Sequence, residues 1–189
     1  MKIFSPRGAV PIVQGESSGL PSEIGTSIYQ AKEGAVFMAI TVDIPGIGNA
    51  TYEHVVFDLN GTLATDGHIS ETLTIALQEL THHMAVHILT AGTHGGVDII
   101  AGITGITPVI VKTGEDKERY VRHLSKVIAV GNGAIDTYML NAADLSICVI
   151  GEEGAYTKTL MSSDIVVHSG QDAVDLLLKP KRLTATLRL

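Results

Sequence analysis

The sequence predicts an α/β protein with a Rossmann-like, doubly wound, mostly parallel sheet and helices on both faces. Short apolar runs rich in Val and Ile alternate with amphipathic segments along most of the 189-residue chain. Such apolar runs are typical of strands buried on both faces. Hydrophobic residues make up 45% of the chain but aromatic residues only 4%, which also fits this class. The length indicates one domain with its own core.

The chain falls into two regions. Residues 1–37 are rich in Gly, Ser and Pro, and we interpret them as an extension of unknown role. Residues 38–189 are expected to form the folded domain, which begins with a β-hairpin. One strand is expected at 36–44, "PGIGN" as the turn, and "ATYEHVVFDL" as a second strand that ends in Asp58.

Strands and helices alternate after this point. Ser70 is a plausible N-cap for a helix with Leu73, Leu77 and Leu80 on one stripe. Later strands are expected at 84–91, 107–112, 127–133, 145–151 and 164–169. Later helices are expected at 95–104, 115–126, 135–143, 154–163 and 171–187.

Composition argues against several classes of protein. A net charge of −7 disfavours a general nucleic-acid-binding surface, because phosphate contacts need a basic face. No apolar run has the length of a membrane span, and the N-terminus has no secretory apolar region, so we expect a cytoplasmic protein that does not bind membranes.

The single cysteine, Cys148, lies in an apolar run and is interpreted as buried. His83 and His87 have a metal-like spacing, but no third ligand is evident.

Polar residues follow the ends of separate predicted strands. Because the carboxyl ends of parallel strands share one edge of a sheet, these side chains are expected to converge. The group comprises Asp58, Asn60, Thr62, Thr90, the region from Lys112 to Lys117, Asn132 and Asp136.

Four stretches in order, "DLNGTL", "ILTAG", "EDK" and "VGNGAIDTYML", resemble the motifs of the haloacid dehalogenase-like (HAD) phosphotransferases. The sequence is most similar to the phosphorylation domain of P-type ATPases and their soluble relatives. The resemblance covers residues 38–178 and implies a HAD-like catalytic domain. Its motifs lie too close together for a cap domain between them.

The resemblance implies a Mg²⁺-dependent phosphohydrolase. Asp58 would attack phosphorus and form an aspartyl-phosphate. The expected Mg²⁺ ligands are Asp58, the Asn60 backbone carbonyl, Asn132 and Asp136. Asn132 and Asp136 could instead cap the following helix.

The phosphoryl group is expected to contact side chains and backbone from three motifs. These phosphate-binding residues are Gly61, Thr62, Thr90, Ala91 and Lys117. Lys117 matches the motif lysine, and Lys112, which directly ends its strand, is the alternative cation.

Asn60 stands where many HAD phosphatases have an acid/base Asp, and P-type ATPases likewise lack an acid there. Since an amide cannot exchange a proton at neutral pH, the phosphoenzyme should break down slowly. Asn132 contributes no charge to a metal site, which should lower metal affinity. The alternative function is therefore a catalytically weak phosphate- or metal-binding regulatory module.

The expected substrate is a phosphorylated small molecule or a macromolecular phosphoester. An uncapped site is open to solvent, which favours a large substrate or closure by a neighbouring subunit in a homo-oligomer.

Overall fold

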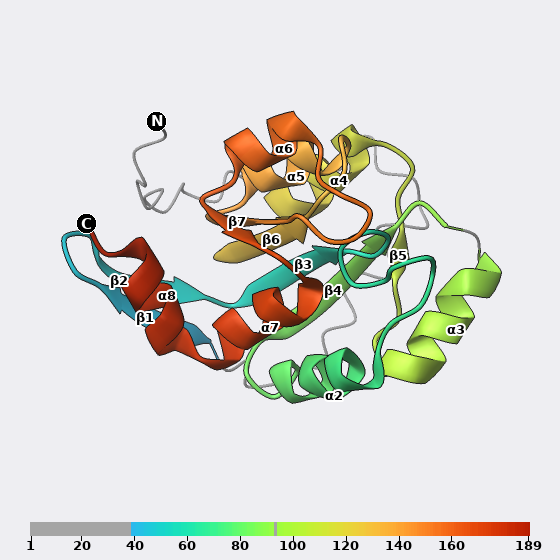
Figure 1. Cartoon of the computed structure of the whole chain (residues 1–189), viewed down its shortest axis with the longest axis horizontal. Helices are drawn as coiled ribbons and strands as arrows, with labels where there is room; N and C mark the ends of the chain where they lie inside the picture. The colour runs from blue at the N-terminus through green and yellow to red at the C-terminus, as the bar shows by residue number, and fades with distance from the viewer. Residues whose placement is uncertain (1–38, 93) are drawn as a thin grey trace, which may run out of the picture.

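The computed structural model describes residues 39–92 and 94–189, and its centre is a six-stranded parallel sheet (Figure 1). The order across the sheet is β5-β4-β3-β6-β7-β8. The strands are β3 (His54–Asp58), β4 (Ala85–Thr90), β5 (Val109–Ile110), β6 (Val127–Gly131), β7 (Leu145–Val149) and β8 (Ile165–Val167). The predicted extension at 1–37 and the start of the predicted strand at 36–44 lie outside the described residues.

Helices cover both faces of this sheet, as the sequence predicts. Along β3, Val55 and Phe57 belong to one apolar core and Val56 to another, because successive strand residues point to opposite faces. The core around Val55 and Phe57 receives α2 (Glu71–Leu80), α3 (His94–Thr104) and α7 (Gly170–Leu178). The other face carries α4 (Gly114–Arg122), α5 (Asp136–Ala142) and α6 (Thr157–Ser162) (Figure 1).

The predicted N-terminal hairpin is present but forms a separate two-stranded sheet. Its strands are β1 (Ile40–Ile44) and β2 (Gly48–Tyr52), which pair antiparallel. The prediction of one continuous strand from Ala50 to Asp58 is wrong. At Glu53 the backbone N–H bonds to the carbonyl of Lys126, 2.9 Å away, so the chain leaves the hairpin and enters the large sheet as β3.

The predicted helix at 171–187 is two helices, α7 and α8 (Pro180–Leu187). Pro180 has no N–H and disfavours helical backbone in the residue before it, and Lys179 accordingly has φ −125° and ψ 69°. The break turns α8 onto the hairpin, where the Thr184 hydroxyl donates to the carbonyl of Asp43 at 3.0 Å.

The connections between the site-bearing strands are short. Within the described residues, only α2 lies between β3 and β4, and only α3 and β5 lie between β4 and α4, so this part of the chain has no cap domain. Cys148 is fully buried in β7, as predicted. No helix in the described residues is long and apolar enough to cross a membrane.

Candidate active site

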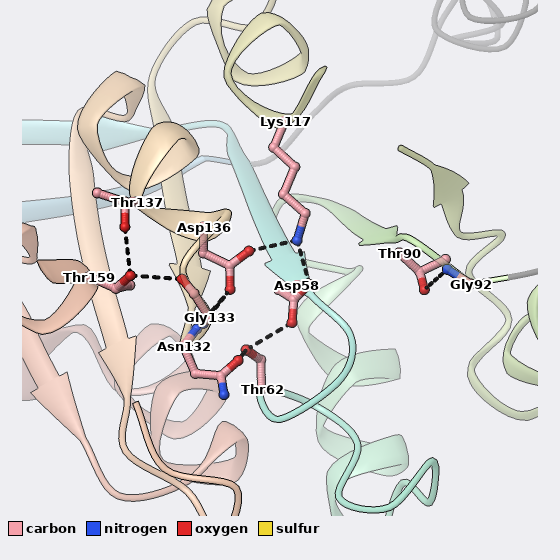
Figure 2. Close-up of polar contacts among 10 residues, drawn as sticks. All are labelled: Asp58, Thr62, Thr90, Gly92, Lys117, Asn132, Gly133, Asp136, Thr137 and Thr159. Atoms are coloured by element: carbon pink, nitrogen blue, oxygen red, sulfur yellow. Dashed lines mark hydrogen bonds and ion pairs between the residues drawn. The ribbon is translucent and has the colours of Figure 1, made fainter. Parts of the chain in front are cut away.

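Three buried charged residues meet at the carboxyl edge of the sheet and form what we call the charged cluster: Asp58, Lys117 and Asp136 (Figure 2). Asp58 ends β3, Lys117 lies in the first turns of α4, and Asp136 begins α5. The Lys117 ammonium donates to Asp58 Oδ1 and, at 2.6 Å, to Asp136 Oδ1. Their exposed fractions are 0% for Lys117, 8% for Asp58 and 1% for Asp136. The alternative cation, Lys112, is exposed.

The position of Lys117 depends on how α4 begins. Thr113 and Asp116 form a capping box, in which the Thr113 hydroxyl accepts from the Asp116 N–H and the Asp116 carboxylate accepts from the Thr113 N–H, both at 3.1 Å. Only residues 111–113 separate the end of β5 from the capped helix, which presents its first turn to the sheet edge. Lys117 therefore reaches Asp58 although the two are far apart in sequence.

Thr62 joins the nucleophile motif to the loop after β6. Its hydroxyl lies 3.3 Å from Asp58 Oδ2 and 3.1 Å from Asn132 Oδ1. Gly61 makes this approach feasible, because it has φ +76° and a Cβ there would lie 2.3 Å from the Asn132 amide nitrogen. The Asn132 side chain is oriented by donating from Nδ2 to the carbonyl of Gly154 at 3.0 Å.

Asp136 has two structural roles. Its Oδ2 accepts the backbone N–H groups of Asn132 at 2.9 Å and Gly133 at 2.8 Å, so it caps the turn between β6 and α5. Its Oδ1 holds Lys117. The alternative that Asn132 and Asp136 cap the following helix is wrong, because the N-cap of α5 is Ile135 and no side chain caps the helix. Gly131 leaves room for this side chain, since a Cβ there would lie 2.7 Å from Asp136 Cγ.

The pKa values in the charged cluster follow from burial and mutual charge. Burial and the nearby Asp136 carboxylate raise the pKa of Asp58 to about 6, and Lys117 partly offsets them. Burial acts to lower the pKa of Lys117, but the Asp58 and Asp136 carboxylates outweigh it and raise that pKa. Two carboxylates and one ammonium leave a net negative charge when all three ionise.

The oxygen atoms beside the charged cluster fit a hard divalent cation. Asp58 Oδ2 and Asn132 Oδ1 both face the Thr62 hydroxyl, and the backbone of Asn60 lies in the same loop. Mg²⁺ uses one or two carboxylates, accepts neutral oxygens and keeps several waters. Across the described residues, no group of three or more His, Cys, Asp or Glu could hold a metal ion, so the donor set would be completed by amide and backbone oxygens.

The other predicted residues lie around this centre. Thr90 is buried at the end of β4, one residue beyond Leu89, which pairs with Asp58. Its hydroxyl accepts from the Gly92 N–H at 3.0 Å and is directed away from the charged cluster (Figure 2). Asn60 and Ala91 are exposed.

Two threonines that the sequence analysis did not select support the loop after β6. The hydroxyls of Thr137 and Thr159 lie 2.7 Å apart, and Thr159 donates to the carbonyl of Gly133 at 2.7 Å (Figure 2). Thr159 is fully buried. Thr137 lies within the stretch "VGNGAIDTYML" and Thr159 lies in none of the four motif stretches, and the two become neighbours only in the folded chain.

A second polar group, which we call the histidine cluster, consists of His54, His87 and Tyr120. His54 Nδ1 lies 3.1 Å from His87 Nε2, and His87 Nδ1 lies 2.9 Å from the Tyr120 hydroxyl. His83, the other histidine of the metal-like spacing, lies in the turn after α2. Its Nε2 is 3.2 Å from Oε1 of Glu79, which is on α2. The two histidines of the metal-like spacing thus have different partners.

Comparison with known proteins gives one sequence relative and a set of similar folds. No family model matches the chain. The uncharacterized protein MJ0073 of Methanocaldococcus jannaschii is 60% identical over 63 residues, which are 33% of this chain and 68% of that protein.

The solved structures with a similar fold include several phosphatases and putative HAD superfamily hydrolases. The 3-deoxy-D-manno-octulosonate 8-phosphate phosphatase of Moraxella catarrhalis, crystallised with magnesium and phosphate, has 19% identity and a TM-score of 0.59, over 71% of this chain and 90% of its own. A cobalt-bound deoxy-D-mannose-octulosonate 8-phosphate phosphatase from Haemophilus influenzae has 16% identity and a TM-score of 0.59, and the match covers 73% of this chain and 94% of that protein. The 3-deoxy-D-manno-octulosonate 8-phosphate phosphatase of Yersinia pestis has 15% identity and a TM-score of 0.57, and the match covers 78% of this chain and 96% of that protein. The chain therefore has the HAD fold, which the sequence predicts.

Proposed function

The chain belongs to the same family as MJ0073, and from its site we propose that it is a Mg²⁺-dependent phosphohydrolase acting through an aspartyl-phosphate on Asp58. The observation that carries this proposal is the buried charged cluster at the sheet edge. A carboxylate at the end of a central parallel strand, bonded to a buried ammonium, is oriented where ligands of such folds bind. The HAD fold of solved phosphatases supports the same reaction class by analogy.

In the first step a carboxylate oxygen of Asp58 attacks phosphorus, a P–O bond to Asp58 forms, and the bond to the leaving oxygen breaks. In the second step water attacks the same phosphorus, releasing inorganic phosphate and restoring the carboxylate. Lys117 orients Asp58 and offsets negative charge, while the Thr62 hydroxyl and the backbone at Gly61 and Ala91 bind phosphoryl oxygens. Thr90 would join them only after its hydroxyl turns from the Gly92 N–H toward the charged cluster. Mg²⁺, held by Asp58, the Asn60 carbonyl, Asn132 and Asp136, would neutralise the anionic reactants.

Asn60 makes the second step slow in this proposal. No carboxylate follows Asp58 at the acid/base position, so the leaving oxygen takes its proton from water and the attacking water lacks a base. Substrates with good leaving groups, such as aryl phosphates, should react faster than alkyl phosphates. A long-lived phosphoenzyme would match the ATPase-like branch that the sequence resembles.

Asp58→Asn tests the covalent mechanism. We expect turnover of an aryl phosphate with saturating Mg²⁺ to fall by about a thousandfold or more, because the nucleophile is removed. Asp98→Asn, which removes an exposed carboxylate from α3, is the matched control and should retain activity. Undiminished turnover by Asp58→Asn, or by wild type in excess chelator, would contradict the mechanism.

Asn60→Asp tests the role of the amide. Turnover should rise by about a hundredfold, most for alkyl phosphates, because a general base is supplied. Wild type should accumulate an acid-stable phosphoenzyme when given a good phosphoryl donor. If turnover does not rise and no phosphoenzyme is trapped, the weak binding module becomes the better description.

A further inference from the structure

Residues 154–159 follow β7, run into α6, and lie against the loop after β6; we call them the 154–159 segment. Three hydrogen bonds join this segment to two consecutive residues of that loop, Asn132 and Gly133. The backbone N–H groups of both residues donate to Asp136 Oδ2 (Figure 2). A displacement of this loop would therefore displace Asp136 from its place beside Lys117.

The first of the three bonds orients the side chain of Asn132. Its Nδ2 donates to the carbonyl of Gly154 at 3.0 Å. Because a carbonyl oxygen can only accept, the amide nitrogen has to face Gly154, and the amide oxygen then faces the Thr62 hydroxyl, 3.1 Å away. This oxygen is the one that the proposed Mg²⁺ site would use. The 154–159 segment thus selects which end of the amide faces that site.

The second bond holds the backbone beside this side chain. The Tyr156 N–H donates to the carbonyl of Asn132 at 2.9 Å. The N–H of the same peptide unit, which belongs to Gly133, donates to Asp136 Oδ2 at 2.8 Å. A planar peptide unit that is bonded at both its oxygen and its hydrogen cannot rotate without breaking a hydrogen bond. The direction of the N–H that Asp136 accepts is therefore fixed from the far side of the peptide.

The third bond comes from a buried hydroxyl. Thr159 donates to the carbonyl of Gly133 at 2.7 Å, and the same carbonyl accepts the backbone N–H of Asp136 at 3.1 Å. Thr159 is 0% exposed and Asp136 is 1% exposed. Loss of a hydrogen-bond partner in such surroundings is costly. Thr159 and Asp136 thus share one acceptor, which couples the position of one to that of the other.

The direction of the hydroxyl bonds follows from the number of protons. A hydroxyl has one proton, and Thr159 gives its proton to Gly133, so the Thr137 hydroxyl, 2.7 Å away, must donate to Thr159. Thr137 follows Asp136 directly in α5. The bonds therefore leave α5 at Thr137, pass through Thr159, and return to the N–H of Asp136 at the Gly133 carbonyl. Such a connected network restrains its members more than separate bonds do.

We infer that Thr159 is a positioning residue for the proposed Mg²⁺ site. It acts by holding Gly133, and through Gly133 it holds the two proposed ligands on either side, Asn132 and Asp136. The inference rests on the proposed function and adds a residue, outside the four motif stretches, that controls how tightly the cation is bound. The role belongs to the hydroxyl, so serine should perform it and valine should not.

Amide hydrogen exchange of the metal-free protein tests the positioning directly. Thr159→Val keeps the branched shape but removes the hydroxyl, so the Gly133 N–H should exchange at least about tenfold faster than in wild type. In Thr159→Ser the rate should stay within about threefold of wild type. Thr104→Val is the matched control, because Thr104 is 1% exposed and its hydroxyl donates to the carbonyl of Ile100 on α3 at 2.8 Å. This control should leave exchange at Gly133 as in wild type.

Calorimetric titration with Mg²⁺ tests the consequence for the cation. Thr159→Val should bind Mg²⁺ about tenfold or more weakly than wild type, because its ligands are no longer held in place. Thr159→Ser and Thr104→Val should bind it within about twofold of wild type. Unchanged exchange or unchanged Mg²⁺ affinity in Thr159→Val would overturn the inference. So would an equal loss in Thr104→Val, a failure of serine to restore binding, or the absence of Mg²⁺ binding by wild type.

Turnover of 4-nitrophenyl phosphate at increasing Mg²⁺ distinguishes positioning from a general loss of structure. In Thr159→Val the Mg²⁺ concentration for half-maximal activity should rise by about tenfold, while kcat at saturating Mg²⁺ stays within about threefold of wild type. A lower kcat at every Mg²⁺ concentration, with an unchanged half-maximal concentration, would contradict positioning.

Binding and turnover also separate this inference from the proposed function. If wild type binds Mg²⁺ and the exchange and titration results hold, but the aryl phosphate is not hydrolysed, the positioning role stands and the phosphohydrolase proposal fails. If the aryl phosphate is hydrolysed with the same Mg²⁺ dependence in wild type and Thr159→Val, the phosphohydrolase proposal stands and the positioning role fails.

Discussion

Strand β3 has an ionisable side chain at each end, and α4 contributes one residue to the cluster around each of them. At the carboxyl end, Asp58 belongs to the charged cluster with Lys117 of α4. At the amino end, His54 belongs to the histidine cluster, whose Tyr120 lies one turn further along α4. Strand β3 and helix α4 thus contribute to two polar groups of different character, the second of which is partly buried and also includes His87 of β4.

The difference lies in charge. Burial and His54 lower the pKa of His87 to about 4, and burial raises the pKa of Tyr120 to about 12, so both are neutral near pH 7. Neutral groups need only satisfied hydrogen bonds when buried, whereas buried ions need opposite charge as well. The fold therefore has buried ions at the carboxyl end of β3, where the proposed chemistry uses them. At the amino end of β3 it has a neutral hydrogen-bonded network, for which no chemical role is proposed.

Removing the cation should have the largest effect on stability. Lys117→Met leaves Asp58 and Asp136 buried and facing each other, and we expect the free energy of unfolding to fall by about 3–5 kcal/mol. Urea denaturation at pH 7 measures the loss. Adding Asp58→Asn to Lys117→Met should recover part of it, because one of the two carboxylates is neutralised. A loss below about 1 kcal/mol would mean that the charged cluster is well solvated.

The two clusters should oppose each other in the pH dependence of stability. The pKa of Asp58 is raised from 3.8 to about 6 on folding, so its contribution to stability decreases as pH rises from 4 to 6. The pKa of His87 is lowered from 6.5 to about 4, so its contribution increases as pH rises from 4 to 6.5. Each contribution is at most about 1.4 kcal/mol per pH unit, and together they partly cancel.

Two variants separate these slopes. Between pH 4 and 6.5, the stability of Asp58→Asn should rise with pH more steeply than that of wild type. The stability of His87→Gln should rise less steeply, or fall. Urea denaturation at half-unit pH intervals checks both slopes, and equal slopes in the three proteins would contradict the assignment.

A smaller effect should follow from changing geometry without changing charge. Gly131→Ala places a Cβ 2.7 Å from Asp136 Cγ and from Met139 Cε, and we expect a loss of about 1–3 kcal/mol. Aryl phosphatase activity should fall as well, because Asp136 moves relative to Lys117. Gly133→Ala is the control, since its Cβ would lie 3.4 Å from Asp136 Oδ2, at the edge of ordinary contact. Equal losses in both variants would show that the crowding at Gly131 is not the cause.

The smallest effect is expected in the histidine cluster. Tyr120→Phe removes the hydroxyl that bonds to His87 Nδ1, at a cost of about 1 kcal/mol. Turnover of an aryl phosphate should stay within about twofold of wild type, since Tyr120 does not contact the charged cluster. A large loss of activity in this variant would mean that the two clusters are coupled through α4.

Much of the fold could be predicted because its signals are local. The buried strands are apolar throughout, and residues such as Ser70 and Gly61 mark where helices and turns begin. The break at Pro180 also has a local signal, since proline disfavours a helix interior, but the predicted helix at 171–187 runs through it. The break at Glu53 has no local signal, because it depends on the backbone hydrogen bond that the Glu53 N–H donates to the carbonyl of Lys126, far along the chain.

The centre of the site was predictable for a different reason. Asp58, Lys117, Asn132 and Asp136 follow strands that share one edge, so their convergence follows from topology. The residues that support the centre were not predictable in this way. The Thr137–Thr159 pair supports the backbone of a loop that is assembled only after folding, and Thr90 turns its hydroxyl to Gly92 rather than to the centre.

The strand order also determines when the site comes into being during synthesis. β3 pairs on one side with β4, which follows it closely in the chain, and on the other with β6, which is made much later. Chains emerge from the ribosome at roughly 5–20 residues per second, and distant parallel pairing is slow to form. A growing chain therefore displays Asp58 for several seconds without Lys117 or Asp136, and Asp58 gains these partners only once the second half of the sheet has been added.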